Sequence, residues 1–280
     1  MREITTTQIT EQIRTLCMEA NYRLPKDVAD RLCTACAEEP WQPAKETLER
    51  LIENMEIAAR EDMPVCQDTG MACVFLEIGQ NLRITGGDLY EAVHEGVRQG
   101  YEDGYLRKST VGDPLRRINT GDNTPAMIHA DIVPGDKLTI TVAPKGAGSE
   151  NMSRLVMLTP SAGKGGVIDF VLETVKLAGP NPCPPIVVGV GIGGSFDVVT
   201  ALAKKALLRP MDQPNPDPFY QEMEAELLTK INALGLGPQG FGGQNTALGV
   251  NIETYPTHIA ALPVAVNINC HVTRHMTVTL

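Results

Sequence analysis

The stretch PNPCPPIVVGVGIGGSFDVVTALAKKALL, residues 180–208, decides the fold class of this chain. Its apolar run IVVGV, rich in β-branched residues, predicts a buried strand that begins at Ile186. A cluster of glycines follows, and FDVVTALAKKALL then predicts a helix from Phe196. A buried strand that leads through glycines into a helix is typical of a mixed α/β (α+β) fold.

Upstream of this stretch, residues 1–62 predict helices. Apolar Ile9, Ile13 and Cys17 are spaced at i, i+4 and i+8, while Pro25 and Pro43 each suit the opening of a further helix. We therefore expect a single domain over residues 1–280, in which residues 1–62 form a helical layer on mixed β-sheets with a ligand cleft.

In the middle and C-terminal parts of the chain, segments with the apolar spacing of a helix alternate with segments typical of a strand. Residues 88–107 predict a helix that ends in the Gly100–Gly104 region, and residues 165–179 and 220–235 predict two more. Residues 127–133 and 137–143 predict a pair of strands joined by the turn Pro134-Gly135-Asp136. Strands interspersed among helices support the mixed α/β assignment.

Composition excludes several functional classes. Among 280 residues, 34 acids and 24 bases give a net charge of −10, so no overall attraction to nucleic acid or anionic lipid is expected. The apolar stretches are shorter than the roughly 20 residues that span a bilayer. The first residues, MREITTTQITEQIR, lack the apolar core of a secretory signal. We expect a cytoplasmic protein whose seven cysteines stay reduced.

These cysteines divide into two groups by their setting. Cys33 and Cys36 form a C-x-x-C pair inside a helical stretch, without the βαβ context of a redox motif or a second ligand pair for zinc, so packing explains them, and Cys17 and Cys73 are interpreted in the same way. Three others lie in turns or at strand ends, in PVCQDTG, NPCPP and NINCHVTRH: Cys66, Cys183 and Cys270. Each of these could be structural, or the three could serve one site.

Three separated thiolates do not complete a tetrahedral structural zinc site. They could hold a [4Fe–4S] cluster through three of its irons and leave the fourth without a protein ligand. A metal with an open position acts as a Lewis acid on a substrate oxygen. The pattern alone does not decide between cluster ligation and a structural role for these three cysteines.

Several longer motifs resemble one family, the class I (iron–sulfur) fumarate hydratases, which include L-tartrate dehydratase. The matching segments are PVCQDTG (64–70), RINTGDNTPA (117–126), GAGSEN (146–151), NPCPP (181–185) and GPQGFGGQNTALGV (237–250). Residues 202–210 and 231–240 are similar to the separate α-subunits of the two-subunit forms. The resemblance covers residues 5–275 and implies a hydro-lyase that hydrates fumarate to (S)-malate, with L-tartrate dehydratase as the alternative.

The resemblance also implies the roles of individual residues. It makes Cys66, Cys183 and Cys270 the ligands of a catalytic [4Fe–4S] cluster. It places Asp68 at the substrate, as proton donor to the departing hydroxyl or as an orienting group, and His258 as an active-site contact. The further substrate-binding positions that it implies are Gln67, Arg107, whose guanidinium can pair with a carboxylate, and Gly148 with its backbone N–H.

In single-chain relatives a further C-terminal domain supplies the remaining active-site residues. We therefore expect a separate β-subunit that completes the active site, in an α–β heterodimer or heterotetramer. The sequence leaves open whether the substrate is malate or tartrate, how large the oligomer is, and whether the cluster survives isolation.

Two other functional classes compete with this interpretation. GVGIGG contains Gly189, Gly191 and Gly194 in a formal G-x-G-x-x-G, but no acidic residue ends a strand about 20 residues later, so dinucleotide binding is disfavoured. We expect these glycines to let backbone pass close to the cluster or to the next helix. A non-enzymatic iron–sulfur carrier or sensor normally ligates every iron, and here a fourth cysteine is lacking.

Overall fold

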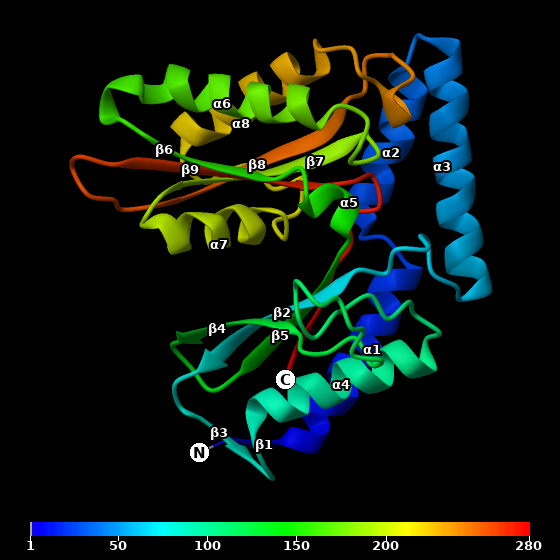
Figure 1. Ribbon diagram of the computed structural model, residues 1–280, viewed down its shortest axis with the longest axis vertical. Helices are drawn as coiled ribbons and strands as arrows, with labels where there is room; N and C mark the ends of the chain where they lie inside the picture. The colour runs from blue at the N-terminus through cyan, green and yellow to red at the C-terminus, as the bar shows by residue number, and fades with distance from the viewer. Residues whose placement is uncertain (1) are drawn as a thin grey trace. The chain divides into compact units, whose positions relative to one another are not determined.

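A computed structural model describes residues 2–280, which divide into two compact units (Figure 1). Unit 1 comprises the chain up to Pro25, Asn54–Ala147 and Arg274–Leu280, and unit 2 comprises Lys26–Glu53 and Gly148–Thr273. Helices and mixed sheets occur in both units, which confirms the predicted α/β class. The assignment of residues 1–280 to one domain stays a prediction.

The secondary structure of unit 1 alternates strands with two long helices. Its elements are β1 (Arg2–Thr5), α1 (Thr6–Tyr22), β2 (Met71–Gly79), β3 (Leu82–Thr85), α4 (Leu89–Asp103), β4 (Met127–Val133), β5 (Leu138–Lys145) and β10 (Met276–Thr279). The main sheet has the order β10-β5-β2-β4, and β1 pairs with β3. Helices α1 and α4 pack together and bury an apolar core with this sheet. Thr5 and Asp88 accept hydrogen bonds from the first turns of α1 and α4, which fixes where these helices begin.

The two strands predicted as a pair, β4 and β5, do not pair with each other. Strand β2 lies between them, parallel to β4 and antiparallel to β5. The connection through Pro134–Asp136 passes the end of β2, where the amide of Gly79 donates to Lys137 and that of Asn81 to Gly135. A Cβ at Gly79 would lie 2.7 Å from the Gly135 carbonyl oxygen, so this crossing needs a glycine. The prediction was wrong because local alternation shows a strand but not its neighbour.

Unit 2 is built on the sheet β6-β9-β7-β8. Its strands are β6 (Arg154–Leu158), β7 (Ile186–Gly193), β8 (Ala247–Tyr255) and β9 (Leu262–Asn269), and its helices are α2 (Lys26–Glu38), α6 (Gly163–Ala178), α7 (Phe196–Ala206) and α8 (Pro218–Asn232). Short turns η1 (Pro160–Ala162) and η2 (Pro238–Gly240) connect them. Figure 1 shows α6 and α8 on one face of the sheet and α7 on the other.

Strand β7 is buried on both faces, as the apolar run predicted. Ile186, Val188 and Val190 join the core under α6 and α8. On the opposite face, a Cβ at Gly189 or Gly191 would lie 2.2 Å from a carbonyl oxygen of α7. The glycines of GVGIGG therefore let α7 pack directly on the strand, which is the packing role expected for them.

The three N-terminal helices form as predicted, but they are divided between the units. Helix α1 belongs to unit 1 and α2 to unit 2, while the sequence of α3 (Gln42–Glu61) crosses the boundary at Asn54. The short α5 (Ala147–Glu150) crosses the other boundary, after Ala147. The motif residues of PVCQDTG thus fall in unit 1, and those of NPCPP and NINC fall in unit 2.

Candidate functional site

In unit 1 the candidate site begins with the segment that connects α3 to β2. Val65 is buried, its amide donates to the Asn21 carbonyl over 2.9 Å, and its carbonyl accepts from Asn54 Nδ2 over 2.9 Å. The next residue, Cys66, is half-buried, and its thiol lies 3.3 Å from Oε1 of the exposed Gln67. The backbone just before the cysteine is therefore fixed, and the cysteine itself is only partly buried.

Two buried side chains hold the other end of this segment. The Tyr101 hydroxyl lies 2.8 Å from the Thr69 carbonyl oxygen and 3.1 Å from that of Gly70, and Asn123 Nδ2 donates to Gly70 over 3.1 Å. Burial raises the pKa of Tyr101 well above its usual value, so this hydroxyl remains a donor. Gly70 has φ +71°, and a Cβ there would lie 2.5 Å from the Lys145 backbone. Thr69 and Gly70 thus fix the C-terminal end of the segment, as Val65 fixes its N-terminal end.

Asp68 lies between these anchors with its carboxylate oriented by backbone donors. One oxygen accepts from the Gly70 amide over 3.0 Å and the other from the Ala147 amide over 2.9 Å. The buried Arg274 donates to the Asp68 carbonyl over 2.6 Å and to Asn21 Oδ1 over 3.1 Å. A carboxylate has about four acceptor positions, so both oxygens can still accept a bond from a substrate.

Arg107 lies on the same side of unit 1 as this segment, because the Thr69 hydroxyl donates to its backbone carbonyl over 3.0 Å. The following residues are held by the fully buried Asn123, whose Oδ1 accepts from the Ser109 amide over 2.7 Å and the Thr110 amide over 3.1 Å. The Arg107 side chain is exposed, and within residues 2–280 its guanidinium makes no hydrogen bond or ion pair. It is a cation available for an anionic ligand.

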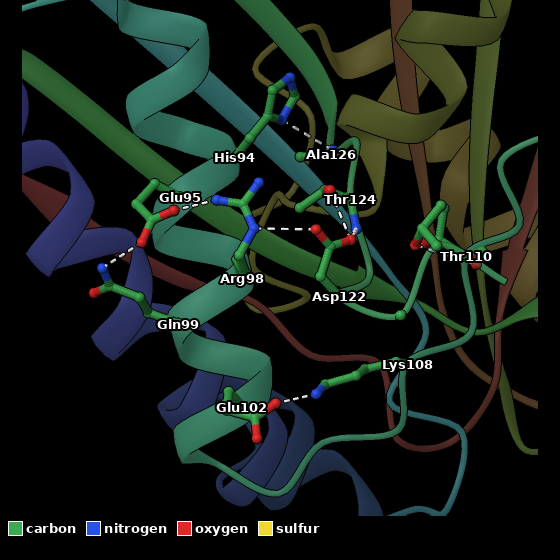
Figure 2. Close-up of polar contacts among 12 residues, drawn as sticks. His94, Glu95, Arg98, Gln99, Glu102, Lys108, Thr110, Asp122, Thr124 and Ala126 are labelled. Atoms are coloured by element: carbon green, nitrogen blue, oxygen red, sulfur yellow. Dashed lines mark hydrogen bonds and ion pairs between the residues drawn. The ribbon is translucent and has the colours of Figure 1, made fainter.

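Helix α4 anchors the loop that carries Arg107 and the NTGDNTPA motif (Figure 2). Arg98 pairs with Glu95 on the helix and donates from Nε to Asp122 on the loop over 3.0 Å. Asp122 also accepts from the amide and the hydroxyl of Thr124. Burial raises the pKa of Asp122, but the bonds from Thr124 and Arg98 outweigh it and lower this pKa to about 2. An ionised carboxylate therefore fastens this loop.

In unit 2 the structure brings the other two predicted ligands together. The Cys183 carbonyl accepts from Nδ1 of His271 over 2.9 Å and from its amide over 3.4 Å, and His271 directly follows Cys270. Cys183 is exposed and has φ +52°, an uncommon conformation for a residue other than glycine, while Cys270 is half-buried. Strained backbone of this kind is typical of functional sites.

Gly148 lies beside the same turn, since the nearest atom to a Cβ placed on it would be the Asn181 carbonyl oxygen, at 3.8 Å. Two residues later, Glu150 accepts from Lys204 over 2.6 Å and from Asn267 Nδ2 over 2.8 Å. This network ties the Gly148 segment to α7 and to β9, three residues before Cys270. Gly148, Cys183 and Cys270 therefore share one end of the unit 2 sheet.

His258 lies at the other end of that sheet. It is an exposed residue of the turn between β8 and β9, and its Nδ1 accepts from the Ala260 amide over 3.1 Å. Cys270 follows the opposite end of β9, so eight strand residues, roughly 25 Å, separate the two. The structure thus does not bring His258 together with Cys183 and Cys270.

The cysteines fit an iron–sulfur ligand set in chemistry. All seven are free thiols, and the three candidates are exposed or half-buried. Thiolates are the usual ligands of such clusters, and the adjacent turns of Cys183 and Cys270 suit two of them. No group of three or more His, Cys, Asp or Glu side chains is gathered as a metal site within residues 2–280. The full three-cysteine set therefore stays a prediction.

Comparison with known proteins decides the family. The sequence model of the fumarate hydratase (Fumerase) family matches residues 10–279. The chain belongs to this family. It is 45% identical over 269 residues to the "Putative L(+)-tartrate dehydratase subunit alpha" of Methanocaldococcus jannaschii, covering 94% of each chain. It is 34% identical over 267 residues to the L(+)-tartrate dehydratase subunit alpha of Escherichia coli UTI89, covering 94% of this chain and 88% of the relative.

Membership confirms the resemblance seen in the motifs, and the family's members and relatives identify the chain as a hydro-lyase. Within residues 2–280, no helix has the length and apolar character needed to cross a bilayer.

The structure adds residues that the sequence did not single out as functional. His271, Gln239, Glu150 and Arg274 all hold backbone or side chains beside the predicted ligands and substrate contacts. Gln239 and Glu150 lie inside two motifs on which the resemblance is based, GPQGFGGQNTALGV and GAGSEN, so their place in these motifs could have marked them as candidates. Arg274 carried no signal, because a single sequence does not show that its guanidinium is buried.

Proposed function

We propose that this chain is the α-subunit of a two-subunit hydro-lyase that dehydrates L(+)-tartrate. The observation that carries the proposal is the contact of Cys183 with His271, which places the turns of Cys183 and Cys270 side by side in a member of the fumarate hydratase family. Relatives at 45% and 34% identity bear the name of L(+)-tartrate dehydratase subunit alpha, and this supports tartrate as the substrate.

In this proposal Cys66, Cys183 and Cys270 would hold a [4Fe–4S] cluster. When bound, the cluster supplies Lewis-acid chemistry, because an iron without a protein ligand polarises the oxygen of a substrate hydroxyl. The exposed or half-buried positions of these cysteines and the uncommon backbone of Cys183 support these assignments.

The protein groups bind and orient a hydroxy-dicarboxylate. Dehydration removes a hydroxyl from one carbon and a proton from its neighbour. The guanidinium of Arg107, which pairs with no group of residues 2–280, suits a bidentate bond to a substrate carboxylate. Asp68, oriented by the amides of Gly70 and Ala147, can as a carboxylate accept a hydrogen bond from a substrate hydroxyl, and in its protonated form it would give its proton to the departing hydroxide, which leaves as water. The Gly148 amide and the exposed Gln67 supply neutral polar contacts.

Fumarate hydratase is the second candidate, and the description of the matching family favours it. Malate and tartrate share the carboxylates and one hydroxyl, so the same groups suit both, and tartrate adds one hydroxyl to be recognised. We also propose a separate β-subunit that supplies the remaining catalytic groups, as the word "alpha" in the relatives' names supports.

Anaerobic reconstitution with iron and sulfide tests these proposals. The chain is assayed with and without its β-subunit on (S)-malate, fumarate and both tartrate enantiomers. We expect about four irons per chain and turnover of L(+)-tartrate that requires both subunits. Faster turnover of malate would favour fumarate hydratase. A cluster whose EPR spectrum does not change when any of these hydroxy-acids is added would favour an electron carrier and overturn the enzyme assignment.

A further inference from the structure

The turn that carries Cys183 has few backbone donors of its own. In the run Pro182-Cys183-Pro184-Pro185 only the cysteine has an N–H, which donates to the Pro180 carbonyl over 3.0 Å. The rest of the turn must be held through its carbonyl groups by donors from elsewhere in unit 2. His271 supplies two of these donors at the Cys183 carbonyl.

The donors for the next carbonyl both come from Gln239. Its backbone amide donates to the Pro184 oxygen over 2.7 Å and its side-chain Nε2 donates to the same oxygen over 2.8 Å. Nε2 also lies 3.3 Å from Nδ1 of His271. Gln239 therefore contacts both the residue after Cys183 and the residue after Cys270.

Gln239 is itself held in a defined position. It has φ +53° and ψ +15° inside η2, a conformation that is uncommon for a residue other than glycine. The neighbouring turn is tied to the buried Thr246, whose hydroxyl accepts from the Gly237 amide and whose carbonyl accepts from the Ile186 amide. Thr246 thus connects the segment of Gln239 to the start of β7, just beyond the prolines.

We propose that Gln239 is a positioning residue for Cys183. It fixes the Pro184 carbonyl, next to the Cys183 carbonyl that His271 holds, so that the Cys183 thiol keeps a constant direction relative to the turn after Cys270. Only the role of these thiols as cluster ligands rests on the proposed function. The fixed conformation of the Cys183 turn can be measured in the metal-free chain.

Hydrogen–deuterium exchange of the metal-free chain tests the positioning directly. In Gln239→Glu the side-chain donor is replaced by an oxygen that faces the Pro184 oxygen, and in Gln239→Ala the side chain is removed. We expect exchange in the peptide covering residues 180–187 to be roughly tenfold faster in both variants, as loss of a hydrogen bond of ordinary strength implies. That peptide has few amides because four of its residues are prolines, so the change is readily assigned.

Gln244→Ala is the matched control, because Gln244 lies five residues further on, is exposed, and uses its backbone amide, not its side chain, to contact Glu39. We expect exchange of residues 180–187 and the thermal midpoint to stay at wild-type values in this variant. Exchange in the Gln239 variants equal to that of Gln244→Ala would overturn the inference.

Iron release to a chelator after anaerobic reconstitution gives the second readout. We expect it to be several-fold faster in Gln239→Glu than in Gln244→Ala. If the wild-type chain takes up no iron while the exchange result holds, the cluster assignment fails and the positioning role stands. Iron release at the same rate in both variants, from a wild-type chain that does load, would contradict the positioning of a ligand.

Discussion

The carbonyl oxygen of Cys183 lies 2.9 Å from Nδ1 of His271, 88 residues later in the chain. The contact follows from the antiparallel pairing of β7 and β9, in which Val187 is opposite Asn269. The turn before one strand and the turn after the other therefore meet at the same end of the sheet. Two cysteines that are remote in sequence become neighbours through strand topology.

Substitution of this pair should abolish iron binding without unfolding the chain. We expect Cys183→Ser and Cys270→Ser to lose most of the iron and sulfide taken up in anaerobic reconstitution, because a neutral hydroxyl is a poor iron ligand. Cys36→Ser is the control, since that cysteine packs in α2. Metal analysis measures the result, and equal iron loss in all three variants would contradict our division of the cysteines.

Thiol reactivity should follow burial in the metal-free chain. Burial raises the pKa of Cys17 to about 12, so at pH 8 almost none of it is thiolate. Cys183 and Cys33 are exposed. We expect iodoacetamide to modify these two first and Cys17 only after unfolding, as followed by peptide mass spectrometry. Early modification of Cys17 in the folded chain would show that the α1–α4 packing is looser than described.

Local sequence patterns predicted the elements of the fold more completely than their arrangement. Helical spacing with proline and glycine boundaries identified α1, α4, α6 and α8, and a continuous run of β-branched residues identified β7, because these signals depend on near neighbours along the chain. The insertion of β2 between β4 and β5 was not predicted, since pairing depends on contacts between distant segments.

The candidate site shows the same limit. The motifs identified Cys183 and Cys270 as related, but not the two residues that hold their turns, because Gln239 and His271 act through backbone carbonyls that a sequence does not display. The resemblance predicted His258 as an active-site contact, and in this chain the full length of β9 separates it from Cys270. Its role in the site stays a prediction.

A substitution in β7 can distinguish two roles of its glycines, close packing of α7 and binding of a dinucleotide. In Gly191→Ala the new Cβ would lie 2.2 Å from the Val199 carbonyl oxygen, so α7 must move away from the sheet. We expect a loss of about 1–3 kcal/mol in the free energy of unfolding, comparable to overpacking a core. Urea denaturation measures it.

Gly165→Ala is the matched control, because a Cβ at this position in α6 meets no atom within 4 Å. We expect it to be neutral or to stabilise by up to about 1 kcal/mol through helix propensity. Equal stability of both alanine variants, or binding of NAD that Gly191→Ala removes, would contradict the packing role.

Asp68 can be tested by an isosteric change. In Asp68→Asn one of the two accepting oxygens becomes an NH2 group, which only donates, so the backbone N–H of either Gly70 or Ala147 loses its partner. We expect a fall of about 10²–10⁴-fold in kcat of the assembled enzyme on its hydroxy-acid, the usual range for loss of a proton-transferring group. Asp136→Asn, in an exposed turn, is the control. A rise in KM alone would assign Asp68 an orienting role.

Asp122 should make the loop of Arg107 sensitive to acid. Its pKa is lowered from 3.8 to about 2, so the ionised form is the one that the folded state stabilises. The contribution of ionised Asp122 to the free energy of unfolding is fully present above pH 4 and is lost as the pH falls towards 2. Because the side chain is 28% exposed, we expect Asp122→Asn to destabilise the chain at pH 7 by only about 1–2 kcal/mol. Urea unfolding from pH 7 to pH 3 measures the difference, which should stay constant down to pH 4 and then narrow. A difference that widens on acidification would show that the bonds from Arg98 and Thr124 do not favour the carboxylate.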